Sequence, residues 1–135
     1  MAKGSFIPES DHTIAASLEF KGTGTALAWY KNVLGAEENM RLQGPDKKVI
    51  QAELGIGDSM IFLAEENSQS NMISQSANGK SRNLHVYVED VDETIKKAIQ
   101  NGATLVMPAT DQFYGDRCGC IDDPFGYTWV LAKHN

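Results

Sequence analysis

Apolar and polar residues alternate over residues 13–21, and this period of two predicts a strand with one packed face. Gly22 and Gly24 interrupt the alternation, and over residues 25–34 the apolar positions recur at helical spacing. Gly35 is expected to end this helix, because glycine readily adopts the left-handed conformation of a C-terminal cap. Three further strands are predicted in the first half, over residues 38–43, 49–56 and 59–64.

The second half repeats this order of elements. A strand over residues 84–89 precedes a helix that Asp90 can cap, with Glu93 in the capping-box position three residues later. Asn101 and Gly102 are expected to end the helix. Three more strands are predicted, over residues 104–107, 117–121 and 127–132, the first of them ending before Pro108.

Equivalent positions in the two halves have a constant separation. Phe20 precedes the first helix as Val88 precedes the second, and Leu63 ends the first half's last strand as Leu131 ends the second's. Both pairs are 68 residues apart, which indicates an internal repeat. We therefore predict an α+β domain over residues 1–135, built from two tandem βαβββ modules whose curved sheets surround a central cavity. The modules would span residues 12–65 and 83–134, joined by a polar linker loop over residues 66–82.

Composition narrows the classes of partner. The net charge of −6 disfavours nucleic acid, because an acidic surface repels phosphate backbones. The same charge would tolerate a cationic ligand, although mild acidity is also typical of proteins that simply stay in solution. No apolar run approaches the roughly 20 residues of a membrane helix, and the N-terminal residues lack the apolar core of a secretory signal. We therefore expect a cytoplasmic protein with no membrane partner.

Cys118 and Cys120 are separated by one residue. Two ligands cannot complete a zinc site, which needs about four protein ligands, or three and a water. Residues two apart in a strand face the same side, so we interpret the pair as small apolar side chains on one face.

Several segments together resemble the vicinal-oxygen-chelate superfamily of glyoxalases, bleomycin-resistance proteins and extradiol dioxygenases. They are IPESDHT near the start, ALAWYKNVLGAE at residues 26–37, LHVYVEDVDETIKKAIQNGA at residues 84–103, DQFYGDR at residues 111–117 and DDPFGYTW at residues 122–129. The similarity covers nearly the whole chain and is greatest to glyoxalase-like proteins related to the phosphonate-operon accessory protein. It implies the two-module fold, a small-molecule ligand and a homodimer, with the modules paired within one chain or exchanged between two.

The resemblance also implies four metal-ligand positions, two in each module. In this sequence they are Ala15, Phe62, Asn83 and Val130. Three of these side chains are hydrocarbon and the fourth is an uncharged amide, whereas divalent transition metals bind imidazole, thiolate or carboxylate groups. We therefore predict no metal at this site and no other cofactor.

Two short strands carry candidate polar groups for the cavity. If Asn83 faces inward, His85 and Tyr87 share its face. His85 could then shuttle a proton or donate a hydrogen bond, or it could be a structural histidine. Ser17 and Glu19 share the inward face of the first strand, where Glu19 could act as a base or bind a cation, or be an exposed charge at the strand end.

Residues 112–117 combine Gln112, Tyr114 and Arg117. Tyr114 offers flat apolar area, and the planar guanidinium of Arg117 suits a carboxylate or a phosphate. The alternative is an internal ion pair of Arg117 with Asp116 or Asp123.

Two functions remain open from the sequence. The first is a metal-free small-molecule-binding protein of the sequestration type, with an unknown ligand. The alternative is a glyoxalase-like lyase or isomerase, metal-independent or with a displaced metal site, in which His85, Glu19 or Arg117 is catalytic. His12 and His134 lie near the chain ends and are expected to be solvated.

Overall fold

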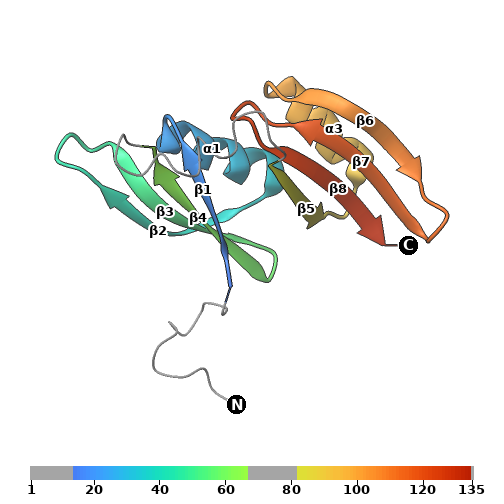
Figure 1. Ribbon diagram of the computed structural model, residues 1–135, viewed down its shortest axis with the longest axis horizontal. Helices are drawn as coiled ribbons and strands as arrows, with labels where there is room; N and C mark the ends of the chain where they lie inside the picture. Colours follow the sequence, from blue (N-terminus) through green and yellow to red (C-terminus); the bar gives the residue numbers. More distant parts are fainter. Residues whose placement is uncertain (1–13, 67–81, 135) are drawn as a thin grey trace, which may run out of the picture. The chain divides into compact units, whose positions relative to one another are not determined.

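The computed structural model describes residues 14–66 and 82–134. The chain forms two compact units, one containing residues 14–66 and the other residues 82–134. In the described residues, each unit has a four-stranded mixed sheet with a helix packed on it (Figure 1). The predicted α+β fold with two βαβββ modules is confirmed. The predicted linker lies outside the described residues except at its two ends.

The described part of the first unit, residues 14–66, is blue to green in Figure 1. Its elements are β1 (Ala16–Phe20), α1 (Thr23–Leu34), β2 (Glu37–Gln43), β3 (Val49–Ile56) and β4 (Ser59–Glu65). The strand order is β1-β4-β3-β2, with β1 parallel to β4 and the other pairs antiparallel. β1 and β4 therefore lie side by side although α1, β2 and β3 separate them in the sequence.

The apolar side of β1 packs against the helix. Leu18 and Phe20 are buried, and the Phe20 ring meets the ring of Tyr30 on α1 with centroids 5.9 Å apart. Because side chains alternate along a strand, Ser17 and Glu19 point to the opposite face of the sheet. The helix ends as predicted, with Gly35 in the left-handed conformation.

The second unit, yellow to red in Figure 1, repeats the arrangement. Its elements are β5 (Asn83–Tyr87), α3 (Val91–Gln100), β6 (Thr104–Asp111), β7 (Asp116–Asp122) and β8 (Thr128–His134). The strand order is β5-β8-β7-β6, with β5 parallel to β8. The predicted cap of the helix is confirmed, since the Asp90 carboxylate accepts a hydrogen bond from the Glu93 backbone N–H at 3.0 Å.

One glycine lets α3 lie close to its sheet. A Cβ atom added to Gly119 of β7 would overlap Cδ1 of Ile95 on α3 and would lie 3.3 Å from the Ala109 backbone. Gly119 therefore faces the helix, and Cys118 and Cys120 face away from it, on one side of the strand as predicted. Cys118 is buried, Cys120 is partly buried, and both are free thiols.

The prediction that a strand would end before Pro108 is wrong, because β6 continues to Asp111. β6 is an edge strand of its sheet, and a proline on an edge need not supply an N–H to a neighbouring strand. The pairing of β6 with β7 also shifts register on both sides of Met107, which accommodates the irregular stretch. Within the described residues, no helix has the length and apolar character needed to span a membrane.

Candidate functional site

The face of the second sheet that points away from α3 carries three of the predicted site residues. Tyr87 pairs in register with Ala132, which pairs with Cys118; His85 pairs with Val130, which pairs with Cys120. Residues paired across neighbouring strands share a face, so His85 and Tyr87 lie on the side of the two cysteines. Asn83, two residues before His85, is on the same side and exposed. The predicted grouping of Asn83, His85 and Tyr87 therefore agrees with the strand register.

Aromatic rings gather on this face. The rings of His85 and Tyr87 are 5.1 Å apart between centroids. The Tyr114 hydroxyl lies 3.8 Å from Sγ of Cys118, which places Tyr114 over the same side of β7. Tyr87 is 64% exposed and Tyr114 57% exposed, whereas Cys118 and Ala132 between them are buried. We call this group of His85, Tyr87 and Tyr114, with its floor of Cys118 and Ala132, the aromatic face.

The surroundings of Tyr114 favour its neutral phenol. Its interaction with Cys118, partial burial and the neighbouring charges of Cys118 and Asp116 all raise the pKa of Tyr114. A neutral phenol keeps its hydroxyl proton and can donate a hydrogen bond. On the same side of β7, burial and the nearby Asp122 raise the pKa of the Cys120 thiol, which disfavours a reactive thiolate.

Beside the aromatic face, Asp116 at the start of β7 pairs with His134 at the end of β8. Oδ1 of Asp116 lies 2.7 Å from Nδ1 of His134. The aspartate side chain is 10% exposed and the histidine side chain 75% exposed. The expectation that His134 would be solvated therefore holds for most of the ring but missed its carboxylate partner. The signal was available, since the turn after Asp122 sets a hairpin register that brings residues 116 and 134 opposite each other.

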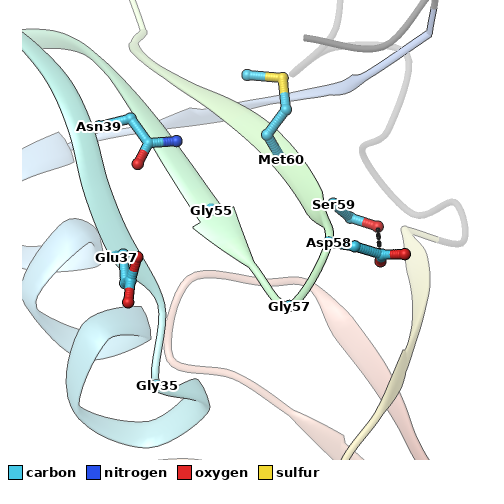
Figure 2. Close-up of a pocket in the computed structure, with 8 residues that line it drawn as sticks. All are labelled: Gly35, Glu37, Asn39, Gly55, Gly57, Asp58, Ser59 and Met60. Atoms are coloured by element: carbon cyan, nitrogen blue, oxygen red, sulfur yellow. Dashed lines mark hydrogen bonds between the residues drawn. The ribbon is translucent and has the colours of Figure 1, made fainter. Parts of the chain in front are cut away.

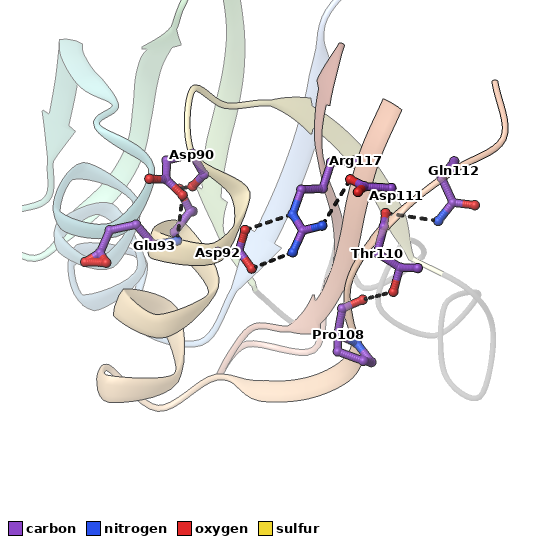
Figure 3. A network of polar contacts seen from close by, with 9 residues as sticks. Asp90, Asp92, Glu93, Pro108, Thr110, Asp111, Gln112 and Arg117 are labelled. Carbon is purple, nitrogen blue, oxygen red and sulfur yellow. Dashed lines mark hydrogen bonds and ion pairs between the residues drawn. The ribbon is translucent and has the colours of Figure 1, made fainter. Parts of the chain in front are cut away.

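Arg117 does not join these residues, because it points to the helix side of the sheet. Its guanidinium donates to both carboxylate oxygens of Asp92 on α3, at 2.9 and 3.0 Å, and to Asp111 at 3.0 Å (Figure 3). These bonds raise the pKa of Arg117 and lower the pKa of Asp92. The sequence interpretation of an internal ion pair named the wrong partners, since Asp116 binds His134 and Asp123 binds elsewhere.

Asp123 instead organises the turn before β8. Its buried carboxylate accepts hydrogen bonds from the backbone N–H groups of Phe125 and Tyr127 and from Nε1 of Trp129. Gln112 is likewise engaged in a turn, where its backbone N–H donates to the Asp116 carbonyl at 2.7 Å. Its side chain donates to the Thr110 carbonyl at 3.4 Å (Figure 3).

The predicted residues of the first unit lie on the equivalent face of their own sheet. Ser17 is exposed and pairs in register with Phe62, while Glu19 is partly buried and pairs with Ala64. Glu19 and Ser17 occupy the places of Tyr87 and His85, 68 residues later. The first unit therefore carries no aromatic group at these two positions.

The family's metal positions do not fit a divalent cation. Phe62 and Val130 lie on the faces away from the helices but present only hydrocarbon, as does Ala15. Asn83 offers a single uncharged oxygen, which is a weak ligand for a transition metal. Within residues 14–66 and 82–134, no three His, Cys, Asp or Glu side chains converge as a metal site. The absence of a metal at these four positions stays a prediction.

The first unit also contains a pocket of about 300 Å³ that the sequence did not predict. It lies between the end of α1, the start of β2 and the β3–β4 turn (Figure 2). Glu37, Asn39 and Asp58 supply most of its polar groups, and Ser59 donates to Asp58 at 3.4 Å. None of the predicted site residues lines this pocket.

Comparisons with known proteins agree with the fold. A family model described as "Glyoxalase/Bleomycin resistance protein/Dioxygenase superfamily" matches residues 21–131. "Uncharacterized protein Mb0911c" of Mycobacterium bovis is 35% identical over 113 residues, which cover 81% of this chain and 74% of that protein.

Solved structures of low sequence identity share the architecture. The Arabidopsis thaliana gene product At5g48480 has a TM-score of 0.73 at 24% identity, over 90% of this chain and 98% of that one. TioX from Micromonospora sp. ML1 has a TM-score of 0.70 at 22% identity, over 92% and 97%. The fosfomycin resistance protein FosX from Listeria monocytogenes has a TM-score of 0.67 at 16% identity, over 92% and 90%. These structural similarities support the fold. Because the family model matches most of the sequence, the chain belongs to the glyoxalase/bleomycin resistance protein/dioxygenase superfamily.

Proposed function

We propose that this protein binds a small planar molecule on the aromatic face of its second unit and holds it without converting it. The observation that carries the proposal is the exposure of Tyr87 and Tyr114 on either side of a buried floor of small residues. Exposed aromatic groups gathered on one face are typical of interaction sites, whereas singly scattered ones are not.

The geometry favours a flat ligand. Two rings rise from a floor of Ala132 and Cys118, so a planar molecule can contact ring faces or edges while covering the floor. Aromatic contacts of this kind contribute about 0.5–1.5 kcal/mol each beyond the area that they bury. His85, next to Tyr87, adds a hydrogen-bonding group that can orient the ligand.

Binding is favoured over metal-assisted conversion by the chemistry of the family's ligand positions. FosX is described as a complex with Mn(II) and a sulfate ion. In this chain, the four metal-ligand positions that the resemblance to the superfamily implies are Ala15, Phe62, Asn83 and Val130. They lack the imidazole and carboxylate donors with which proteins usually polarise a substrate through a metal.

We further propose that the protein acts as a homodimer, which sedimentation equilibrium would test.

The binding proposal can be tested with small aromatic probes such as indole, quinoline and 4-nitroanisole, by ligand-observed NMR and thermal shift. Tyr87→Ser and Tyr114→Ser should each weaken binding, because each removes one ring from the face. Ile99→Ser is the matched control, since Ile99 is also an exposed apolar residue but lies on α3, outside the face.

Retained binding in both tyrosine variants, or no binding of any probe by the unmodified protein, would contradict the proposal. Turnover of a methylglyoxal–thiol adduct that disappears in His85→Ala would instead establish the lyase alternative.

A further inference from the structure

We propose that Asp116 and His134 form a proton-accepting dyad and that the ligand of the aromatic face is therefore a phenol. This inference rests on the proposed function of that face and names the class of its ligand. Three features carry it: the contact between the two side chains, their contrast in exposure and their position beside Tyr114.

The contact orients the imidazole. A carboxylate only accepts hydrogen bonds, so the 2.7 Å contact between Oδ1 of Asp116 and Nδ1 of His134 requires the proton to be on Nδ1. In the neutral ring, Nε2 is then the basic nitrogen. Because Asp116 is nearly buried and His134 largely exposed, the carboxylate stays behind the ring while Nε2 is accessible from solvent.

The dyad lies on the same side of the sheet as the aromatic face. Asp116 and Cys118 are two residues apart on β7 and so point the same way. Tyr114 reaches Cys118 from the turn between β6 and β7, and the Asp116 charge is one of the groups that act on the Tyr114 phenol. Figure 1 shows the end of β8 beside this turn. A ring held against Tyr114 can therefore direct a substituent toward His134.

The negative charge of the dyad favours a neutral ligand that has an acidic O–H group. In the complex, the ligand's phenolic O–H bond breaks and an N–H bond forms on Nε2 of His134, which yields a phenolate and an imidazolium with no change of oxidation state. The Asp116 carboxylate stabilises that imidazolium. An aromatic carboxylate that is already ionised gains less, because the neutral imidazole with Asp116 carries a net negative charge and repels it.

Two probes that differ by one methyl group test the inference. 4-Nitrophenol carries the acidic proton, and 4-nitroanisole replaces it with a methyl group. Near neutral pH, where an ordinary imidazole is largely uncharged, we expect the unmodified protein to bind 4-nitrophenol about tenfold more tightly than 4-nitroanisole, the effect of one hydrogen bond to a charged group. Bound 4-nitrophenol should also show a larger fraction of phenolate absorbance than the free probe at the same pH.

The variants separate the dyad from its surroundings. His134→Gln should bind the two probes equally, and Asp116→Asn should lose most of the preference while keeping the imidazole. Lys133→Gln is the matched control, because Lys133 is the exposed neighbour of His134 on β8 and points the other way. It should keep the tenfold preference. Circular dichroism checks folding, and if Asp116→Asn fails to fold, His134→Gln alone decides.

Each outcome is decisive. Equal binding of the two probes by the unmodified protein, a preference that survives in His134→Gln, or tighter binding of 4-nitrobenzoate than of 4-nitrophenol would overturn the dyad. If the tyrosine variants weaken binding of 4-nitroanisole but the unmodified protein binds 4-nitrophenol no more tightly, the dyad is refuted and the binding role of the aromatic face stands. If neither probe binds, the aromatic face and the dyad fall together.

Discussion

The first helix depends on a carboxylate from a distant strand. α1 begins after Gly22, which has a positive φ of 94° and no side chain to cap the helix. Glu65, the last residue of β4, supplies the cap. It accepts hydrogen bonds from the backbone N–H groups of Gly22 and Thr23, at 3.1 and 2.9 Å, and from the Thr23 hydroxyl at 2.8 Å. We predict that Glu65→Ala destabilises the first unit.

The size of the effect follows from these contacts. Losing an N-terminal cap costs about 1 kcal/mol, and a poorly solvated donor left without a partner costs about 1–3 kcal/mol. Thr23 is fully buried and the Glu65 side chain only 16% exposed, so water replaces the carboxylate incompletely. We expect Glu65→Ala to lower the free energy of unfolding by about 2–4 kcal/mol. Glu65→Gln keeps one acceptor oxygen and should cost about half as much.

The same carboxylate predicts a pH dependence. Burial by itself would raise the pKa of Glu65, but the hydrogen bonds from Thr23 and Gly22 and the charge of Lys48 outweigh it, and the pKa is lowered in the folded protein. The unfolded chain therefore binds the proton more readily. The stabilisation is present above the pKa of an unfolded glutamate, about 4.3, and is lost as the pH falls through the lower folded value. The difference between the unmodified protein and Glu65→Gln should shrink over that interval.

Chemical denaturation followed by circular dichroism measures the free energy, and hydrogen exchange assigns the loss to a helix. Amides of α1 should lose protection, while amides of α3, which Asp90 caps, should not. Glu37→Gln is the matched control, since Glu37 is an exposed carboxylate of the same unit. A cost for Glu65→Ala below about 0.5 kcal/mol, which is ordinary for a surface substitution, would refute the capping role. So would a difference that grows on acidification.

Three further substitutions test the second unit. Gly119→Ala should cost about 1–3 kcal/mol in chemical denaturation because its Cβ overlaps Ile95, and adding Ile95→Val should restore part of the loss. Asp123→Asn should cost about 1–3 kcal/mol, because an amide cannot accept from both the backbone and Nε1 of Trp129, and no loss would argue against the buried carboxylate as an organiser. Arg117→Lys should lower the melting temperature only slightly, and by less in high salt, because its ion pairs are largely exposed; a large, salt-independent drop would contradict this.

The fold could be predicted because local patterns and tertiary packing agree. The alternation in β1 and the helical spacing in α1 arise from burial of one side of each element, and the repeat at 68 residues constrained both halves. Local reasoning failed at Pro108. There the position of β6 at the edge of its sheet, which depends on the order of all four strands, permits the proline.

The site was less predictable because its decisive contacts join distant residues. Alternation placed His85 and Tyr87 on one face, since that needs only a strand. One partner of Arg117 is Asp92, 25 residues earlier on a helix, and nothing local distinguishes Asp92 from other aspartates. The capping role of Glu65 was unpredictable for the same reason, because the helix end that it caps lies 43 residues earlier.

The two repeats have diverged where the fold permits it. The position 68 residues after Glu65 is Lys133, which cannot cap a helix N-terminus, and α3 is capped by its own Asp90 instead. The end of β8 therefore caps no helix. His134, which follows Lys133, pairs with Asp116 instead. Likewise His85 and Tyr87 stand where the first unit has Ser17 and Glu19. Since both units form the same sheet with either set, the fold does not require these aromatic and imidazole groups, and their exposure together on one face agrees with the ligand-binding role that we propose for them.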